Sequence, residues 1–169
     1  MKTARLLLLA VLVILTCGYD RDVANINDEA NRLFDQGKID EAKALYEEVK
    51  TLAPESAEVR YNLANVAYNK EAYEDALKEY LALAKAKSLE AKLKSHAYYN
   101  AGDAYYRMQK TDEAIEAYKK ALWEDPKDED AKFNLELLLK KKNEQNQEKQ
   151  DQKDQDKQDQ NKSTKQSIM

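Results

Sequence analysis

The chain has 169 residues and a net charge of −4, with 36% charged residues but only three glycines and two prolines. This length suits one small domain with flanking segments, and so few helix-breaking residues favour an all-helical protein. The mildly acidic balance argues against a nucleic-acid partner, which would require a basic face. No run alternates apolar and polar residues with the Val, Ile and Thr enrichment that predicts a strand.

Residues 1–18 have the pattern of an export leader. Lys2 and Arg5 precede an unbroken apolar run over residues 6–15. That run is too short to span the hydrocarbon core of a membrane, which takes about 20 residues, so a signal peptide is the better interpretation. We therefore expect an exported protein, either in the periplasm or attached to the periplasmic face of a membrane.

Cys17 is the only cysteine, which excludes a disulfide within one chain. Its place after the apolar run resembles the lipidation site of bacterial lipoproteins, although Leu15 and Thr16 fit that pattern poorly. The alternative is ordinary cleavage after Gly18, which would remove Cys17. A third possibility is that the leader stays uncut as an anchor, so membrane association could come from acylation or from the leader itself.

Residues 23–128 contain a unit of about 34 residues three times, the period of a helix-turn-helix solenoid. The text YNLANVAYNKEAYEDALKEY at 61–80 returns as YNAGDAYYRMQKTDEAIEAY at 99–118. We expect a repeat domain over 19–142, with repeats at about 23–56, 57–94 and 95–128.

Three positions of the unit explain how its two helices could pack. Small residues at positions 8 and 20 let the helix backbones approach, and a tyrosine at position 24 fills the space beside them. These residues are Ala30, Ala64 and Gly102; Ala42, Ala76 and Ala114; and Tyr46, Tyr80 and Tyr118. Pro54 and Pro126 follow the second helices and should end them.

The second repeat lacks the proline and is four residues longer than the others. Its extra stretch, AKAKSLEAKLKS, contains no helix breaker. We expect a lengthened helix that starts near Ser88, because serine is a good N-cap.

Beyond residue 128, the text DEDAKFNLELLLKKKN begins a further helix. A cap helix at 129–142 would cover the open end of the solenoid with an apolar stripe of Phe133, Leu135, Leu138 and Leu139. Residues 143–169 are rich in Gln, Asp and Lys and cannot bury enough apolar surface to order themselves, so they predict a disordered tail.

The sequence offers no catalytic constellation. His96 is the only histidine, Cys17 lies in the leader, and no glycine-rich loop is present. We expect a binding protein and not an enzyme, with no catalytic residues, no cofactor and no metal site.

The spacing of small, aromatic and proline positions over 23–128 resembles the tetratricopeptide repeat. That resemblance implies an all-α, right-handed solenoid of about three helix-turn-helix repeats, a C-terminal cap helix and a disordered tail. It also implies that the first helices line a concave groove for a protein partner. The groove residues would be Asn27, Asn31, Phe34, Tyr61, Asn62, Asn65, Tyr68, His96, Tyr99, Asn100, Asp103, Tyr106 and Arg107.

Tyrosine and asparagine suit the capture of an extended peptide, since tyrosine gives contact area and asparagine pairs with backbone donors and acceptors. The alternative is that some of the tyrosines, with Asn62, Asn100 and Asn134, hold neighbouring repeats together. In chaperone adaptors of the family, cations clamp a C-terminal carboxylate. Here uncharged or weakly basic residues (Asn27, His96 and Asn100) stand at those positions, so no such clamp is expected.

The leader, the repeats and the Gln-rich tail together resemble the small tetratricopeptide proteins of the bacterial aerotolerance (Bat) operon. Residues 97–142 carry most of that resemblance. It implies a cell-envelope scaffold that binds membrane-anchored von Willebrand factor A-type proteins in a system for oxidative stress tolerance. The alternatives are a lipoprotein that assists assembly of pili or outer-membrane machinery, and a redox enzyme, against which the lone leader cysteine argues.

Overall fold

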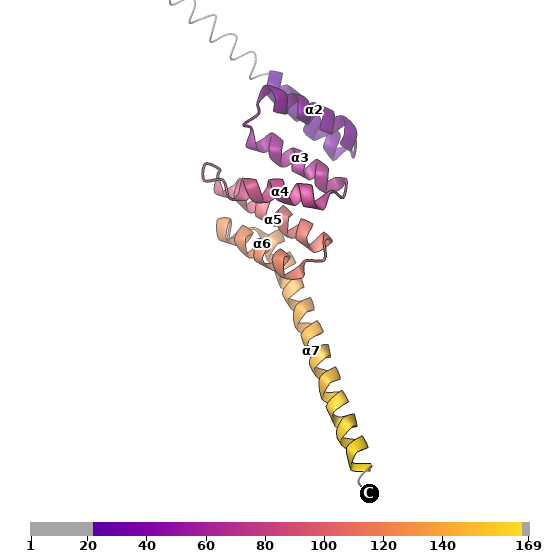
Figure 1. The fold of residues 1–169 in the computed structure, drawn as a ribbon. Helices are drawn as coiled ribbons and strands as arrows, with labels where there is room; N and C mark the ends of the chain where they lie inside the picture. Colours follow the sequence, from indigo (N-terminus) through magenta and orange to yellow (C-terminus); the bar gives the residue numbers. More distant parts are fainter. Residues whose placement is uncertain (1–21, 167–169) are drawn as a thin grey trace, which may run out of the picture.

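The structure, a computed structural model, describes residues 22–166, and of the side chains beyond residue 153 only that of residue 155. The expected leader with Cys17, and residues 167–169, lie outside the described residues. Residues 22–166 form helices joined by short connections, with no strand (Figure 1). None of the helices in this part of the chain is long and apolar enough to cross a membrane.

Three antiparallel helix pairs stack in chain order (Figure 1). A helix over residues 22–35 pairs with α2 (Ile39–Leu52), α3 (Ala57–Asn69) pairs with α4 (Tyr73–Ala84), and α5 (Ala91–Arg107) pairs with α6 (Thr111–Glu124). The last helix, α7 (Glu129–Gln166), packs on α6 and then projects from the stack. The predicted solenoid of three helix-turn-helix repeats is confirmed.

The turn inside each repeat uses one residue in the left-handed backbone region. Gly37 has φ of 75°, and Glu71 and Gln109, at the same repeat position, have φ of 61°. Each donates its amide hydrogen to a carbonyl three residues back, at 2.9 Å. Glycine adopts this conformation without steric cost, so the first turn is the least strained of the three.

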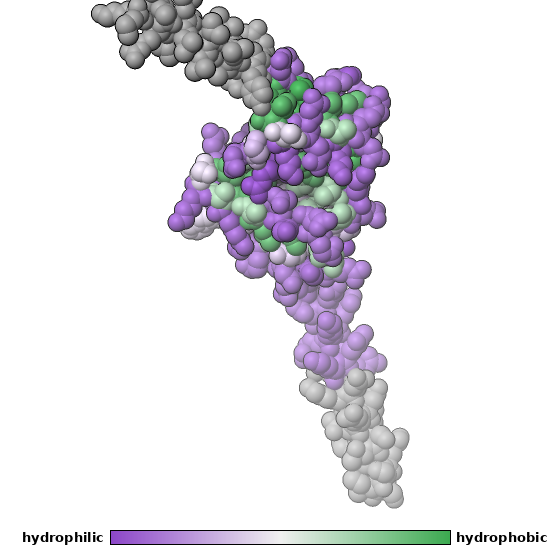
Figure 2. Space-filling view, turned by 45° about the horizontal axis from the view of Figure 1, so that its top comes forward, coloured by the Kyte–Doolittle hydropathy of each residue, from purple (hydrophilic) through white to green (hydrophobic). Residues whose placement is uncertain are grey.

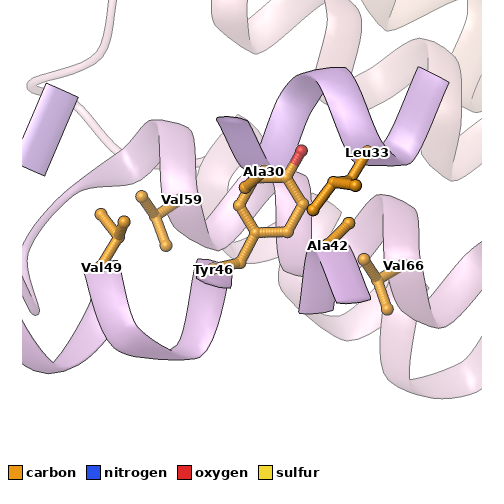
Figure 3. Close-up of a cluster of buried hydrophobic side chains, with 7 residues drawn as sticks. All are labelled: Ala30, Leu33, Ala42, Tyr46, Val49, Val59 and Val66. Carbon is orange, nitrogen blue, oxygen red and sulfur yellow. The ribbon is translucent and has the colours of Figure 1, made fainter. Parts of the chain in front are cut away.

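The core follows the small and aromatic positions of the repeat. Ala30 and Ala42 are fully buried, and the ring of Tyr46 packs in one cluster with them, Leu33 and nearby valines (Figure 3). Tyr80 and Tyr118 are buried in the same way. A continuous apolar layer therefore runs through the array, and each repeat buries its face against the next.

The long linker of the second repeat differs from the expectation. Helix α5 has 17 residues against 13 in α3, but it begins at Ala91 and its N-cap is Glu90, so Ser88 is not the cap. Leu89 packs against the cluster of Leu83, Ala84 and Ala97. Burying this leucine folds the chain into a turn before the helix can start.

The cap helix also has a different register from the one expected. Leu138 and Ala131 are buried and Leu135 packs against the core. Phe133 is 66% exposed and Leu139 38% exposed, so these two do not cover the end of the array. The reason is the repeat register of α7. Ala131 and Leu138 stand at the repeat positions of Val59 and Val66, which in α3 pack against the preceding repeat.

Helix α7 continues to Gln166, beyond the expected end of the cap helix at residue 142. Residues 129–166 contain no glycine or proline, and Gln, Glu and Lys sustain a helix that packing has already nucleated. Side chains 143–153 are all exposed, and Figure 2 shows this part covered by hydrophilic groups. Residue 142 therefore marks the end of packing and not the end of the helix.

Candidate functional site

One hydrogen-bonded unit of three side chains occurs three times along the array. An oxygen on the first helix of a repeat accepts a hydrogen bond from the buried tyrosine of the second helix of that repeat. It accepts another from an asparagine on the first helix of the next repeat, or on α7 after the third repeat. The units are Asn31 with Tyr46 (2.7 Å) and Asn62 (3.0 Å), Asn65 with Tyr80 (2.7 Å) and Asn100 (3.0 Å), and Asp103 with Tyr118 (2.5 Å) and Asn134 (3.4 Å).

These units give the asparagines a structural role. Burial raises the pKa of Tyr46 to about 12 and also raises the pKa of Tyr80 and of Tyr118, so each phenol is a hydrogen-bond donor at neutral pH. The acceptor oxygens are thereby occupied by partners inside the protein. Asn62 and Asn100 tie neighbouring repeats together, which is the alternative that the sequence left open for them.

Tyr61 and Tyr99 also lie between repeats. The Tyr61 hydroxyl accepts a hydrogen bond from Asn100 on α5 at 2.8 Å, and the Tyr99 hydroxyl accepts one from Asn134 on α7 at 3.2 Å. Their rings pack against Tyr80 and Tyr118, with centroids 5.9 Å and 5.7 Å apart. Both rings are half-buried, so each contributes to the cohesion of the array as well as to its concave surface.

One of the predicted groove residues on the first helix, Asn27, is buried and therefore not accessible to a partner. Asn27 is 9% exposed and donates a hydrogen bond to Glu58 at 2.8 Å. Its carbonyl oxygen is buried without a partner among the described residues. Asn27 therefore acts as a contact between the first and second repeats.

A hollow of about 240 Å³ lies where the first helices of the three repeats meet. Aromatic and polar side chains share its lining, which consists of Phe34, Asn65, Tyr68, Asn69, Tyr80, Asn100 and Asp103. All of these except Tyr80 lie on first helices. The structure thus brings together several of the predicted groove residues in one recess.

Asp103 is the one carboxylate in the lining of this hollow. Burial raises the pKa of its carboxyl group, the hydrogen bond from Tyr118 opposes that effect, and the nearby charge of Asp130 raises the pKa further. The hydrogen-bond partners of Asp103 among the described residues are Tyr118 and Asn134, and neither carries a positive charge.

Two cations occupy the rim at the C-terminal ends of the first helices. Arg107 donates to the Tyr73 hydroxyl at 3.0 Å and lies 5.5 Å from the centre of that ring. Lys141 donates to the Tyr106 hydroxyl at 3.1 Å and lies 5.4 Å from its ring. Tyr106 remains 43% exposed. At this rim Arg107 and Lys141 therefore each bond to the hydroxyl of a tyrosine and lie over its ring.

His96 lies at the opposite, acidic end of the groove. It is exposed and lines a shallow depression of about 410 Å³ that also contains Asp125, Asp128, Glu129 and Asp130. Asp128 is already used, because it caps α7 by accepting the amide of Ala131 at 2.9 Å. No group of three metal-ligating side chains is found among the residues that the structure describes.

Two exposed residues on α7 were not assigned to the groove from the sequence: Phe133 was expected in the buried stripe of the cap helix, and Leu137 was not singled out. Phe133 and Leu137 lie 34 positions after Tyr99 and Asp103, at the corresponding places of the unfinished fourth unit. They are 66% and 39% exposed. Extending the repeat frame through α7 would have identified them, since α7 opens with the same helix pattern.

Two family models match the chain, both described as tetratricopeptide repeat, over residues 27–92 and 95–128. Together these matches cover more than half of the sequence. The chain belongs to the tetratricopeptide-repeat family. Proteins of this family are generally non-catalytic scaffolds that present an extended concave surface for binding other proteins. A comparison with curated proteins finds no match.

Solved structures agree on the fold. The chain is similar to the Sgt2 tetratricopeptide domain of Aspergillus fumigatus, with 21% identity, a TM-score of 0.65, and coverage of 75% of this chain and 82% of that one. The TPR2AB domain of yeast Sti1 is 22% identical, with a TM-score of 0.67, and the match covers 75% of this chain and 49% of that one. The Yersinia enterocolitica type III secretion chaperone SycD is 15% identical, with a TM-score of 0.61, and the match covers 70% of this chain and 93% of that one. At these identities the similarity supports the fold of the chain and not a shared function.

Proposed function

We propose that this tetratricopeptide-repeat protein is a non-catalytic scaffold that binds an extended segment of a partner protein in its concave groove. The observation that carries the proposal is the hollow formed by Phe34, Tyr68 and Asp103 with their asparagine neighbours. Aromatic rings supply contact area there, and the side-chain amide groups of Asn65 and Asn69 can donate hydrogen bonds to an extended backbone. Structures of similar fold support this mode, since yeast Sti1 is seen with pHSP90 and SycD with a peptide of YopD.

The proposed setting is the bacterial cell envelope. Its support is the leader-like text of residues 1–18 and the resemblance of residues 97–142 to the tetratricopeptide proteins of the aerotolerance operon. The partners would then be membrane-anchored von Willebrand factor A-type proteins in a system for oxidative stress tolerance.

A pull-down from a solubilised envelope fraction tests this function. The bait is the full chain with a C-terminal tag, and the matched bait carries Tyr68→Ala and Tyr106→Ala. A third bait, Trp123→Ala, removes an aromatic that is 85% exposed on α6 and therefore off the groove. Helicity by circular dichroism should be the same for all three.

The proposal predicts that a von Willebrand factor A-type protein is captured by the wild type and by Trp123→Ala but not by the double variant. Capture of pilus or outer-membrane assembly components would instead favour the alternative function, a lipoprotein that assists assembly of that machinery. Equal capture by all three baits would show that the groove is not the binding surface.

A further inference from the structure

Asp103 is an exception in a row that is otherwise asparagine. Asn31 and Asn65 occupy its position in the two preceding repeats, and all three accept the same pair of hydrogen bonds on Oδ1. In the asparagines the second atom of the group is an amide donor. In Asp103 it is Oδ2, an acceptor that shares the negative charge. Of these three residues, Asn65 and Asp103 line the hollow, so Asn65 offers an amide donor there and Asp103 an anionic acceptor.

No described cation neutralises Asp103. From α6 it faces the Tyr118 hydroxyl, and from α7 it faces Asn134 and the like charge of Asp130. Arg107 lies one turn further along α5 but bonds to Tyr73. Both hydrogen bonds reach Oδ1, so Oδ2 has no partner inside this part of the protein. A half-buried carboxylate without a counter-charge is unfavourable unless something else supplies one.

The hollow beside Asp103 has the shape and lining for a long cationic side chain. Its volume of about 240 Å³ is large enough for a lysine or arginine side chain, and the rings of Phe34 and Tyr68 line it. Aromatic faces attract cations and also pack against their methylene stems. An acidic side chain would be repelled, and an apolar one would desolvate the carboxylate further. A divalent metal would need more oxygen ligands than one carboxylate and amide oxygens that are already bonded.

We infer that this hollow is a subsite for a lysine or arginine side chain of the partner segment. The inference rests on the proposed function, because it names what one position of that segment must be. The ammonium or guanidinium group bonds to Oδ2 of Asp103, while the stem lies against Tyr68. Segments that lack a cation at this position bind less tightly.

The test uses phage-displayed random dodecapeptides as the probe. The targets are four forms of the full chain: the wild type, Asp103→Asn, Asp75→Asn and the Tyr68→Ala, Tyr106→Ala double variant. Asp103→Asn restores the residue of the preceding repeats and keeps Oδ1 as acceptor for Tyr118, so the fold should be unchanged. Asp75→Asn is the matched control, since it removes the same charge from an exposed position on α4 that does not line the hollow.

The expected result is a wild-type motif with a lysine or arginine at one fixed position, retained with Asp75→Asn and lost with Asp103→Asn. A selected peptide should bind Asp103→Asn at least about tenfold more weakly, as expected for the loss of a charged hydrogen bond. A motif without a cation, or the same cation preference in Asp103→Asn, overturns the subsite and leaves groove binding intact. Enrichment of no peptide over the Tyr68→Ala, Tyr106→Ala variant overturns the proposed function and the subsite with it.

Discussion

Gly102 lies directly against the ring of Tyr118. A Cβ atom placed on Gly102 would come within 2.6 Å of Tyr118 Cε1 and 2.7 Å of Cδ1. The ring has no room to withdraw, because Tyr118 is 2% exposed and its hydroxyl is fixed on Asp103. In the other repeats the same position holds Ala30 and Ala64, so only the third repeat places a residue without a Cβ atom against its buried tyrosine.

Gly102→Leu should therefore destabilise the array by overpacking, by about 1 to 3 kcal/mol or more. Thermal unfolding followed by circular dichroism measures the effect. Ala91→Leu, at an exposed site on the same helix, serves as control and should change the melting temperature little. An unchanged melting temperature for Gly102→Leu would contradict the packing described for the third repeat.

The pair of Asn65 and Tyr80 should be energetically coupled. Asn65→Ala leaves the hydroxyl of Tyr80, a residue that is 1% exposed, without its acceptor, which should cost about 1 to 3 kcal/mol. Tyr80→Phe removes the donor and should make Asn65→Ala less harmful. Urea unfolding of both single variants and the double variant gives the coupling energy, and additive effects would show that this hydrogen bond contributes nothing to stability.

Asp103 should make stability depend on pH in a defined direction. Its pKa is raised in the folded state, chiefly by burial, so its favourable contribution is complete below the unfolded value of about 4 and is lost as pH rises through the folded value. Asp103→Asn removes this loss. Its melting temperature relative to wild type should therefore be higher at pH 7 than at about pH 4, and a difference independent of pH would contradict the uncompensated carboxylate.

The repeat itself could be predicted from the sequence because the residues that pack its helices together recur at the same positions in each unit. Small residues such as Ala30 and Ala42 and the buried tyrosines are identical or similar in each unit, and their burial follows from that regularity. Leu89 has no counterpart in the other repeats. Its burial shifted the start of α5, and only the three-dimensional contact shows why.

The groove was harder to predict than the core. The repeat frame correctly placed Tyr68 and Asp103 on first helices, but it could not say which asparagine atoms are used internally, because that depends on distances of about 3 Å between helices. Phe133 was assigned to the buried stripe of the cap helix and Leu137 was not considered for the groove, because apolar residues in a cap helix are expected to be buried. The polar hydrogen-bonded units thus account for most of the difference between the expected groove and the observed one.

The most direct test of the central claim is photo-crosslinking from inside the groove. A benzoyl-phenylalanine replaces Tyr106, which is 43% exposed on α5, or Trp123, which is 85% exposed on α6. Both proteins are expressed at equal levels in cells, irradiated and purified through a tag. A protein adduct from position 106 and none from position 123 is the predicted result. Adducts of equal yield from both positions, or from position 123 alone, would contradict the claim that the concave groove holds the partner.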